Sequence, residues 1–424
     1  MENGITISNF NRELTWIFAD STSGRLMNIF DPREIRADRV PAPGPWRRRS
    51  NLSPGSAFAS FLPSSLLSPA SWIPFKPFQG GVIPLRLMYL NAGSQQMEPV
   101  HGAYYEIRLM EYQGRELVTV ATETGYTSSS GVALIPCDGE IYQGWFETDG
   151  WKANVLYAGN PSVSGNVDDD CDSPSYIDVD AIYDDEFHLL TQFTNIAFEA
   201  GSDFGYGRGP VDVEIHDTTS HYDPNDDRIK LDSLWVWQTG AADWVKAHEY
   251  GHAFHNIALG GMPSVPPSCR PHGFTSDEAM ECAFAEGWAD YFGWWITGSP
   301  PSSVESNGYL TDDDGSDTEG PIASFFWDLT DSGMEAHDSV AFPASYAAGI
   351  LKTCEVDGGT RASGIDHIIY CMENQVDTII TNDPDYFPDR DSDPSSYSEG
   401  VAEPQGWSWQ VIRNLWIENL YNGG

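Results

Sequence analysis

Three histidines and a glutamate gather in the segment "AHEYGHAFHN" (247–256), although the whole chain has only 10 histidines. His248, Glu249 and His252 form the pattern H-E-x-x-H. On a helix, positions 248 and 252 lie one turn apart on the same face, so both imidazoles reach a single metal ion and Glu249 lies over its open side. Catalytic zinc takes three protein ligands and leaves a fourth position for water, whose proton a nearby carboxylate removes during attack on a substrate.

A second acidic pair follows downstream and offers the missing third ligand. Thr275 and Glu278 have capping-box spacing, which predicts a helix that starts there. Within that helix Glu286 and Asp290 are four residues apart and share a face, so Glu286 can bind the ion while Asp290 accepts the ring N–H of a ligand histidine. Glu278 and Glu281 are the alternative ligands, and an exposed amphipathic helix is the alternative to a metal site.

His255 lies seven residues after His248 and shares its helix face. A site built from three histidines near one helix needs its last histidine ten residues after the first, and that position is Ala258. We therefore expect His255 to pack beside the ligands or to contact one of them.

The segments "HEYGHAFHN" and "AEGWADYFG" resemble the gluzincin metallopeptidases of the thermolysin and fungalysin types. The resemblance covers roughly residues 185–330. It implies that His248, His252 and Glu286 bind zinc, that Glu249 is the general base, and that Asp290 orients a ligand histidine.

The same resemblance implies an α+β fold in which a mixed sheet precedes two zinc-bearing helices and a mainly helical C-terminal subdomain. The edge strand of such a sheet binds an extended substrate, and "VDVEIHD" (211–217) or "DRIKLD" (227–232) would be that strand. Thermolysin-like enzymes also place an oxyanion-stabilising histidine after the third ligand, whereas residues 311–329 contain none. The substitute candidates are Tyr346, His367 and Tyr370.

The charge of the chain is strongly negative, with 63 acidic and 22 basic residues and a formal net charge of -41. Such a surface repels nucleic acid and anionic lipid, so we expect neither as a partner. Most acidic runs are interpreted as solvated surface. In "DDDGSD" (312–317), however, Asp312, Asp314 and Asp317 resemble a compact calcium loop, which makes a structural Ca²⁺ ion the alternative.

Six cysteines allow 15 connectivities, and their positions as sequence neighbours favour three local disulfides and an oxidising compartment: Cys137 with Cys171, Cys269 with Cys282, and Cys354 with Cys371. A bridge from Cys269 to Cys282 would fasten the loop after the first zinc helix to the second helix. We therefore expect a secreted protein, although residues 1–10 do not resemble a signal peptide. No run of 18 apolar residues occurs, so no membrane-spanning helix is expected.

The chain divides into three predicted parts. Residues 1–78 are rich in Pro, Ser and Arg and are interpreted as a leader, a pro-segment or an irregular arm. Residues 79–160 contain short runs with period-two alternation, typical of a small all-β sandwich, and faintly resemble prealbumin-like accessory domains. Residues 161–424 form the predicted catalytic domain, beginning with an acidic linker and a helix near residue 185.

The resulting hypothesis is a secreted zinc peptidase, most simply a monomeric endopeptidase that acts on peptide or protein substrates. One alternative keeps the zinc but trims a terminus or cleaves a non-protein amide. Another is a non-catalytic binding or surface-layer protein with a degenerate site, which the intact Glu249 argues against.

Overall fold

A computed structural model of the 424-residue chain gives two units, residues 1–48 and 49–424. The described residues of the first unit form an antiparallel pair of short strands, β1 (Ile17–Ala19) and β2 (Leu26–Asn28). The remaining structural description covers these residues: 81–137, 141–157, 159–170, 176–178, 184–216, 219–238, 240–263, 269, 273–276, 279–298, 300, 317–331, 341–356, 360–361, 364–374, 378–379 and 415. The prediction for residues 1–78 therefore falls largely outside the described residues.

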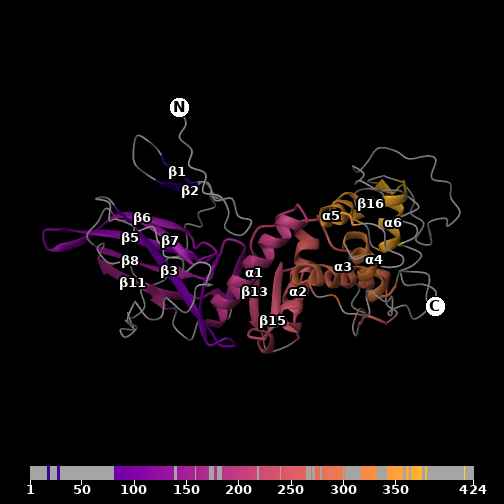
Figure 1. Ribbon diagram of the computed structural model, residues 1–424, viewed down its shortest axis with the longest axis horizontal. Helices are drawn as coiled ribbons and strands as arrows, with labels where there is room; N and C mark the ends of the chain where they lie inside the picture. The colour runs from indigo at the N-terminus through magenta and orange to yellow at the C-terminus, as the bar shows by residue number, and fades with distance from the viewer. Residues whose placement is uncertain are drawn as a thin grey trace, which may run out of the picture. The chain divides into compact units, whose positions relative to one another are not determined.

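Two sheets of mainly antiparallel strands form where period-two alternation predicts strands. Buried Ile83, Leu85 and Leu87 of β3 belong to the same core as buried Ile107 and Leu109 of β5, while the residues between them are more exposed. One sheet has the order β11-β8-β5-β6, and in the other β3 pairs with β12, β4 and β7 (Figure 1). The strands are β3 (Gly81–Asn91), β4 (Gln96–Pro99), β5 (Tyr104–Gln113), β6 (Glu116–Tyr126), β7 (Val132–Cys137), β8 (Ile141–Glu147), β11 (Val163–Asp170) and β12 (Tyr176–Asp178).

The acidic segment after residue 160 is not a simple linker, which corrects the sequence prediction. Its first part forms β11 and pairs with β8, and a later part forms β12 and pairs in parallel with β3. Conversely, β9 (Ala153–Tyr157) pairs in parallel with β13 and not with the sandwich strands. A boundary at residue 160 therefore does not separate the sandwich strands from the catalytic domain. Backbone hydrogen bonds pair acidic strands into a sheet even where the sequence shows no apolar period.

The second architectural layer is a five-stranded sheet with the order β10-β9-β13-β15-β14. Two of its three inner strands, β13 (Val211–His216) and β15 (Arg228–Asp232), are parallel and bury Val211, Val213, Ile229 and Leu231. The edge is β14 (His221–Asp223), antiparallel to β15, while β10 (Asn160–Pro161) lies at the other edge. The expected edge strands at 211–217 and 227–232 are thus internal, because β9 pairs with the outer side of β13 and the short strand β14 pairs with the outer side of β15.

Helices cover this sheet and carry the candidate site. Helix α1 (Asp184–Asp203) contacts β9, and α2 (Ala241–Ile257) contacts β14 and β15 (Figure 1). Helix α3 (Met280–Thr297) packs on α2 and on α4 (Glu319–Thr330). The close α2–α3 approach uses Gly251, where an added Cβ would lie 3.2 Å from the Cα of Ala289.

Helix α3 begins at Met280 and not near Thr275, which corrects the predicted start. Its N-cap, Ala279, has an extended backbone and no side-chain cap, and residues 274–275 form a turn instead. The helix therefore does not begin at the position that the capping-box spacing predicts. Residues 277–278 lie outside the described part, so the predicted capping partner is not placed.

The C-terminal described elements are mainly helical, with α5 (Ala344–Thr353), α6 (Ile365–Asn374) and a small sheet of three two-residue strands, β16 (Glu355–Val356), β17 (Thr360–Arg361) and β18 (Thr378–Ile379). Two predicted disulfides are confirmed: Cys269–Cys282 fastens the loop after α2 to α3, and Cys354–Cys371 joins the end of α5 to α6. The third predicted pair includes Cys171, which lies outside the described residues. Within the described part, no helix is long and apolar enough to cross a membrane.

Candidate metal centre

Three side chains from two helices converge at the α2–α3 contact. His248 and His252 lie one turn apart on α2, and Glu286 faces them from α3. Their ligand atoms all lie within 4.8 Å of one another. The Oε2 atom of Glu286 is 3.2 Å from Nε2 of His248 and 3.1 Å from Nε2 of His252. Two ligands of a tetrahedral zinc at about 2.0–2.1 Å would be about 3.3 Å apart, so the spacing suits such an ion.

The proton assignment also favours a cation between these atoms. His248 Nδ1 is 2.7 Å from Oδ1 of Asp290, which is 1% exposed, so Nδ1 carries a proton and donates it to the carboxylate. In a neutral ring the lone pair of Nε2 then faces the Glu286 carboxylate. That arrangement is favourable only with a second proton on the ring or with a metal ion in its place.

Burial and hydrogen bonding shift the pKa values of the group in different directions. Burial opposes the charge of His248, but hydrogen bonds to Asp290 and Glu286 outweigh it and raise the pKa of that imidazole. Burial would also raise the pKa of Glu286, yet His252 and His248 hold it well below its ordinary value. Burial raises the pKa of Asp290 to about 6 despite its hydrogen bond with His248. The result is a carboxylate that stays ionised between two imidazoles.

Glu249 lies next to the first histidine and is 6% exposed. Burial raises the pKa of its carboxyl group, and the neighbouring His248 and His252 act in the opposite direction. Its carboxylate makes no hydrogen bond within the part of the chain that the structure describes. A raised pKa and an uncommitted carboxylate suit a group that must accept and then release a proton.

His255 and the predicted oxyanion candidates lie in other surroundings. His255 packs edge-on against Phe284 (ring centroids 5.7 Å) and Trp288 (5.8 Å), and burial lowers its pKa to about 3. Tyr346 of α5 packs against Phe342, and His367 of α6 lies close enough to Glu281 for that charge to act on its pKa, which burial lowers. Tyr370 is also in α6. The oxyanion role stays a prediction for all three.

The calcium prediction falls largely outside the described residues, which exclude Asp312 and Asp314. Asp317 is described, and its carboxylate accepts a hydrogen bond from the hydroxyl of Thr318 just before α4. A structural Ca²⁺ ion at this loop stays a prediction.

Two residues near the centre were missed by sequence reasoning. His221 starts the edge strand β14, which contacts α2, and it acts electrostatically to lower the pKa of Glu249. Trp244 lies one turn before His248, with ring centroids 5.1 Å apart. Neither carries a sequence signal, because a single histidine in a three-residue strand and a single helix tryptophan match no motif.

Comparison with known families now adds independent support. Residues 211–346 match the family model of the mycolysin C-terminal domain. This mycolysin-like region runs from β13 into α5 and includes α2, α3 and the converging side chains. It covers about a third of the chain and supports a relationship with zinc metallopeptidases. No curated protein matches the chain. The two sheets that contain β3 and β5 precede the mycolysin-like region, whereas β9 and β10 pair into the sheet that the region shares.

Proposed function

We propose that this protein is a secreted zinc-dependent endopeptidase in which Glu249 is the general base. The observation that carries the proposal is the convergence of His248, His252 and Glu286, with Glu249 on the same turn of α2. The match of residues 211–346 to the mycolysin C-terminal domain supports a peptidase, and the two disulfides are compatible with an extracellular location.

The residues of this chain supply the metal ligands, the general base and the orienting carboxylate for hydrolysis. When bound by the two histidines and Glu286, zinc would lower the pKa of a water molecule to about 7 and polarise a carbonyl group. Glu249 takes the proton of the attacking water and later delivers it to the leaving amine. Asp290 holds the His248 ring in the tautomer that leaves Nε2 free to coordinate.

The substrate is proposed to bind along β14. This strand pairs with β15 on one side, and among the described strands it has no partner on the other. An extended peptide can add to such an edge through backbone hydrogen bonds. Because β14 contacts α2, a peptide on this edge would pass beside the helix that carries Glu249.

Three carboxylate variants test the proposal. Glu249→Gln should retain one zinc per chain and lose hydrolysis by at least about 100-fold, because the general base is gone and the ligands are intact. Glu286→Gln should lose zinc, whereas Glu281→Gln, one turn and a residue earlier on α3, should keep both zinc and activity. Zinc content is measured by atomic absorption, and hydrolysis with a fluorogenic peptide blocked at both ends, which only an endopeptidase cleaves. Unchanged turnover of Glu249→Gln would refute the mechanism.

A further inference from the structure

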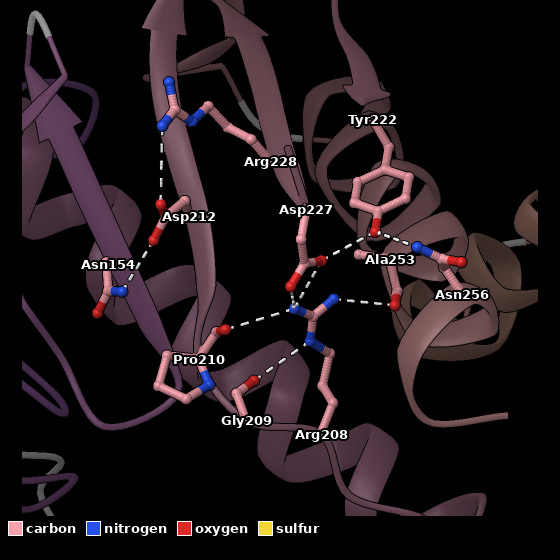
Figure 2. Close-up of polar contacts among 10 residues, drawn as sticks. All are labelled: Asn154, Arg208, Gly209, Pro210, Asp212, Tyr222, Asp227, Arg228, Ala253 and Asn256. Carbon is pink, nitrogen blue, oxygen red and sulfur yellow. Dashed lines mark hydrogen bonds and ion pairs between the residues drawn. The ribbon is translucent and has the colours of Figure 1, made fainter. Parts of the chain in front are cut away.

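A buried arginine lies beside the helix that carries the metal centre. Arg208 precedes β13, and the exposed fraction of its side chain is 1%. Its guanidinium group donates hydrogen bonds to both carboxylate oxygens of Asp227, at 2.9 and 3.0 Å, and to the carbonyl of Ala253 at 2.9 Å (Figure 2). The backbone carbonyls of Gly209 and Pro210 accept further bonds at 3.2 and 3.4 Å.

These contacts join parts of the chain that are far apart in sequence. Ala253 is in α2, immediately after the metal-site residue His252, and Asp227 ends the turn between β14 and β15. Asp227 has a φ of 48°, a left-handed conformation that is uncommon for a residue with a side chain. The turn therefore holds an unfavourable backbone geometry while its carboxylate meets the buried guanidinium.

The cluster continues onto the edge strand itself. Tyr222 of β14 donates its hydroxyl proton to Asp227 at 2.8 Å, and Asn256 of α2 donates to the same hydroxyl at 2.8 Å (Figure 2). Arg208, Asp227, Tyr222 and Asn256 together form what we call the Arg208 clamp. The clamp fixes the edge strand to the turn of α2 that follows His252.

We propose that Arg208 is a positioning residue that sets the distance between the substrate-binding edge β14 and the general base on α2. This inference rests on the proposed peptidase function. A peptide added to β14 moves with that strand, whereas Glu249 moves with α2, so the link between the two elements fixes the scissile carbonyl against the base. A misplacement of about 1 Å in such a geometry costs on the order of 100-fold in rate.

The test compares Arg208→Met with Arg228→Met. Arg228 is on β15 and has a side chain that is 26% exposed. It pairs with Asp212 of β13 (Figure 2) and with Glu214 of the same strand. Arg208→Met should keep its zinc but lose kcat/KM on the order of 100-fold for an internally quenched octapeptide that spans the edge strand. The loss should be much smaller for a blocked dipeptide amide, which uses little of that strand. Arg228→Met should resemble the wild type with both peptides.

Two further measurements keep the proposal falsifiable if Arg208→Met does not fold. Tyr222→Phe removes only the hydroxyl between Asp227 and Asn256, and it should show the same dependence on peptide length with a smaller loss. Hydrogen exchange over residues 219–232 should be faster in both clamp variants than in Arg228→Met. Equal losses on both peptides, or exchange no faster than in the control, would overturn the positioning role. A wild-type chain that binds zinc but cleaves neither peptide would instead overturn the proposed function.

Discussion

Gly287, next to the metal-site residue Glu286, lies where α3 packs closely against α4 and yields a quantitative prediction. A Cβ added at this position would lie 2.8 Å from the carbonyl oxygen of Glu319 and 2.8 Å from both Cβ and Cγ2 of Ile322. Ordinary contacts of this kind begin at 3.4 Å, so the methyl group lacks about 0.6 Å of space. The carbonyl oxygen of Glu319 and the Cβ of Ile322 are fixed by the backbone, so they cannot move aside as the end of a flexible side chain can.

Gly287→Ala should therefore lower the free energy of unfolding. Overpacking in a well-filled core costs about 1–3 kcal/mol, and three simultaneous contacts place the cost in the upper half of that range. Replacing a glycine inside a helix by alanine stabilises the helix by about 1 kcal/mol, which offsets part of this cost. The expected net loss is thus about 1–2 kcal/mol.

Gly201 in α1 provides the matched control, because its added Cβ would meet only the carbonyl of Tyr206 at 4.0 Å. Gly201→Ala should raise the free energy of unfolding by up to about 1 kcal/mol. Urea unfolding followed by tryptophan fluorescence measures both, and the 15 tryptophans of the chain supply the signal. If Gly287→Ala were as stable as Gly201→Ala, the close α3–α4 packing described here would be wrong.

Two more predictions concern the histidines. Asp290→Asn should weaken zinc binding by about 10- to 100-fold in a competition titration with a chelating dye, because the buried amide no longer holds the His248 ring with a full charge; unchanged affinity would contradict the orienting role. His188 stacks on Trp237, and burial together with the charge of Lys246 lowers its pKa from 6.5 to about 4. The folded state therefore favours the neutral ring, and stability should fall by up to about 3 kcal/mol as the pH drops from 6.5 to 4. His188→Gln should flatten this part of the stability profile and His216→Gln, at the exposed end of β13, should not.

The elements around the metal centre were predictable because their signals are local. His248 and His252, and likewise Glu286 and Asp290, are each four residues apart, and helical geometry alone puts each pair on one face. Helix α1 and the strands β3 and β5 to β8 were predictable for the same reason, since an apolar period identifies the buried face of an element.

Strand partners were less predictable, because a period says which face is buried and not which neighbour covers it. The strand β9 has the expected pattern, but it pairs with β13 across more than fifty residues of sequence. The strands β11 and β12 lack an apolar period, and their pairing depends on the length and position of β8 and β3. The edge β14 carries only three residues, too few for any period to appear.

The metal ligands and the substrate-binding edge strand of the proposed site are positioned by different interactions. This difference explains why the sequence predicted only the metal side. The metal side depends on two helices that approach through glycines, and helix periodicity reveals both. The substrate side depends on the buried charge of Arg208, whose surroundings "FGYGRGP" match no motif. A buried guanidinium is stable only when all its partners are present, so the loss of Asp227 alone would leave an unpaired charge beside α2. The clamp therefore couples the edge strand to the metal-bearing helix, although none of its members is a metal ligand.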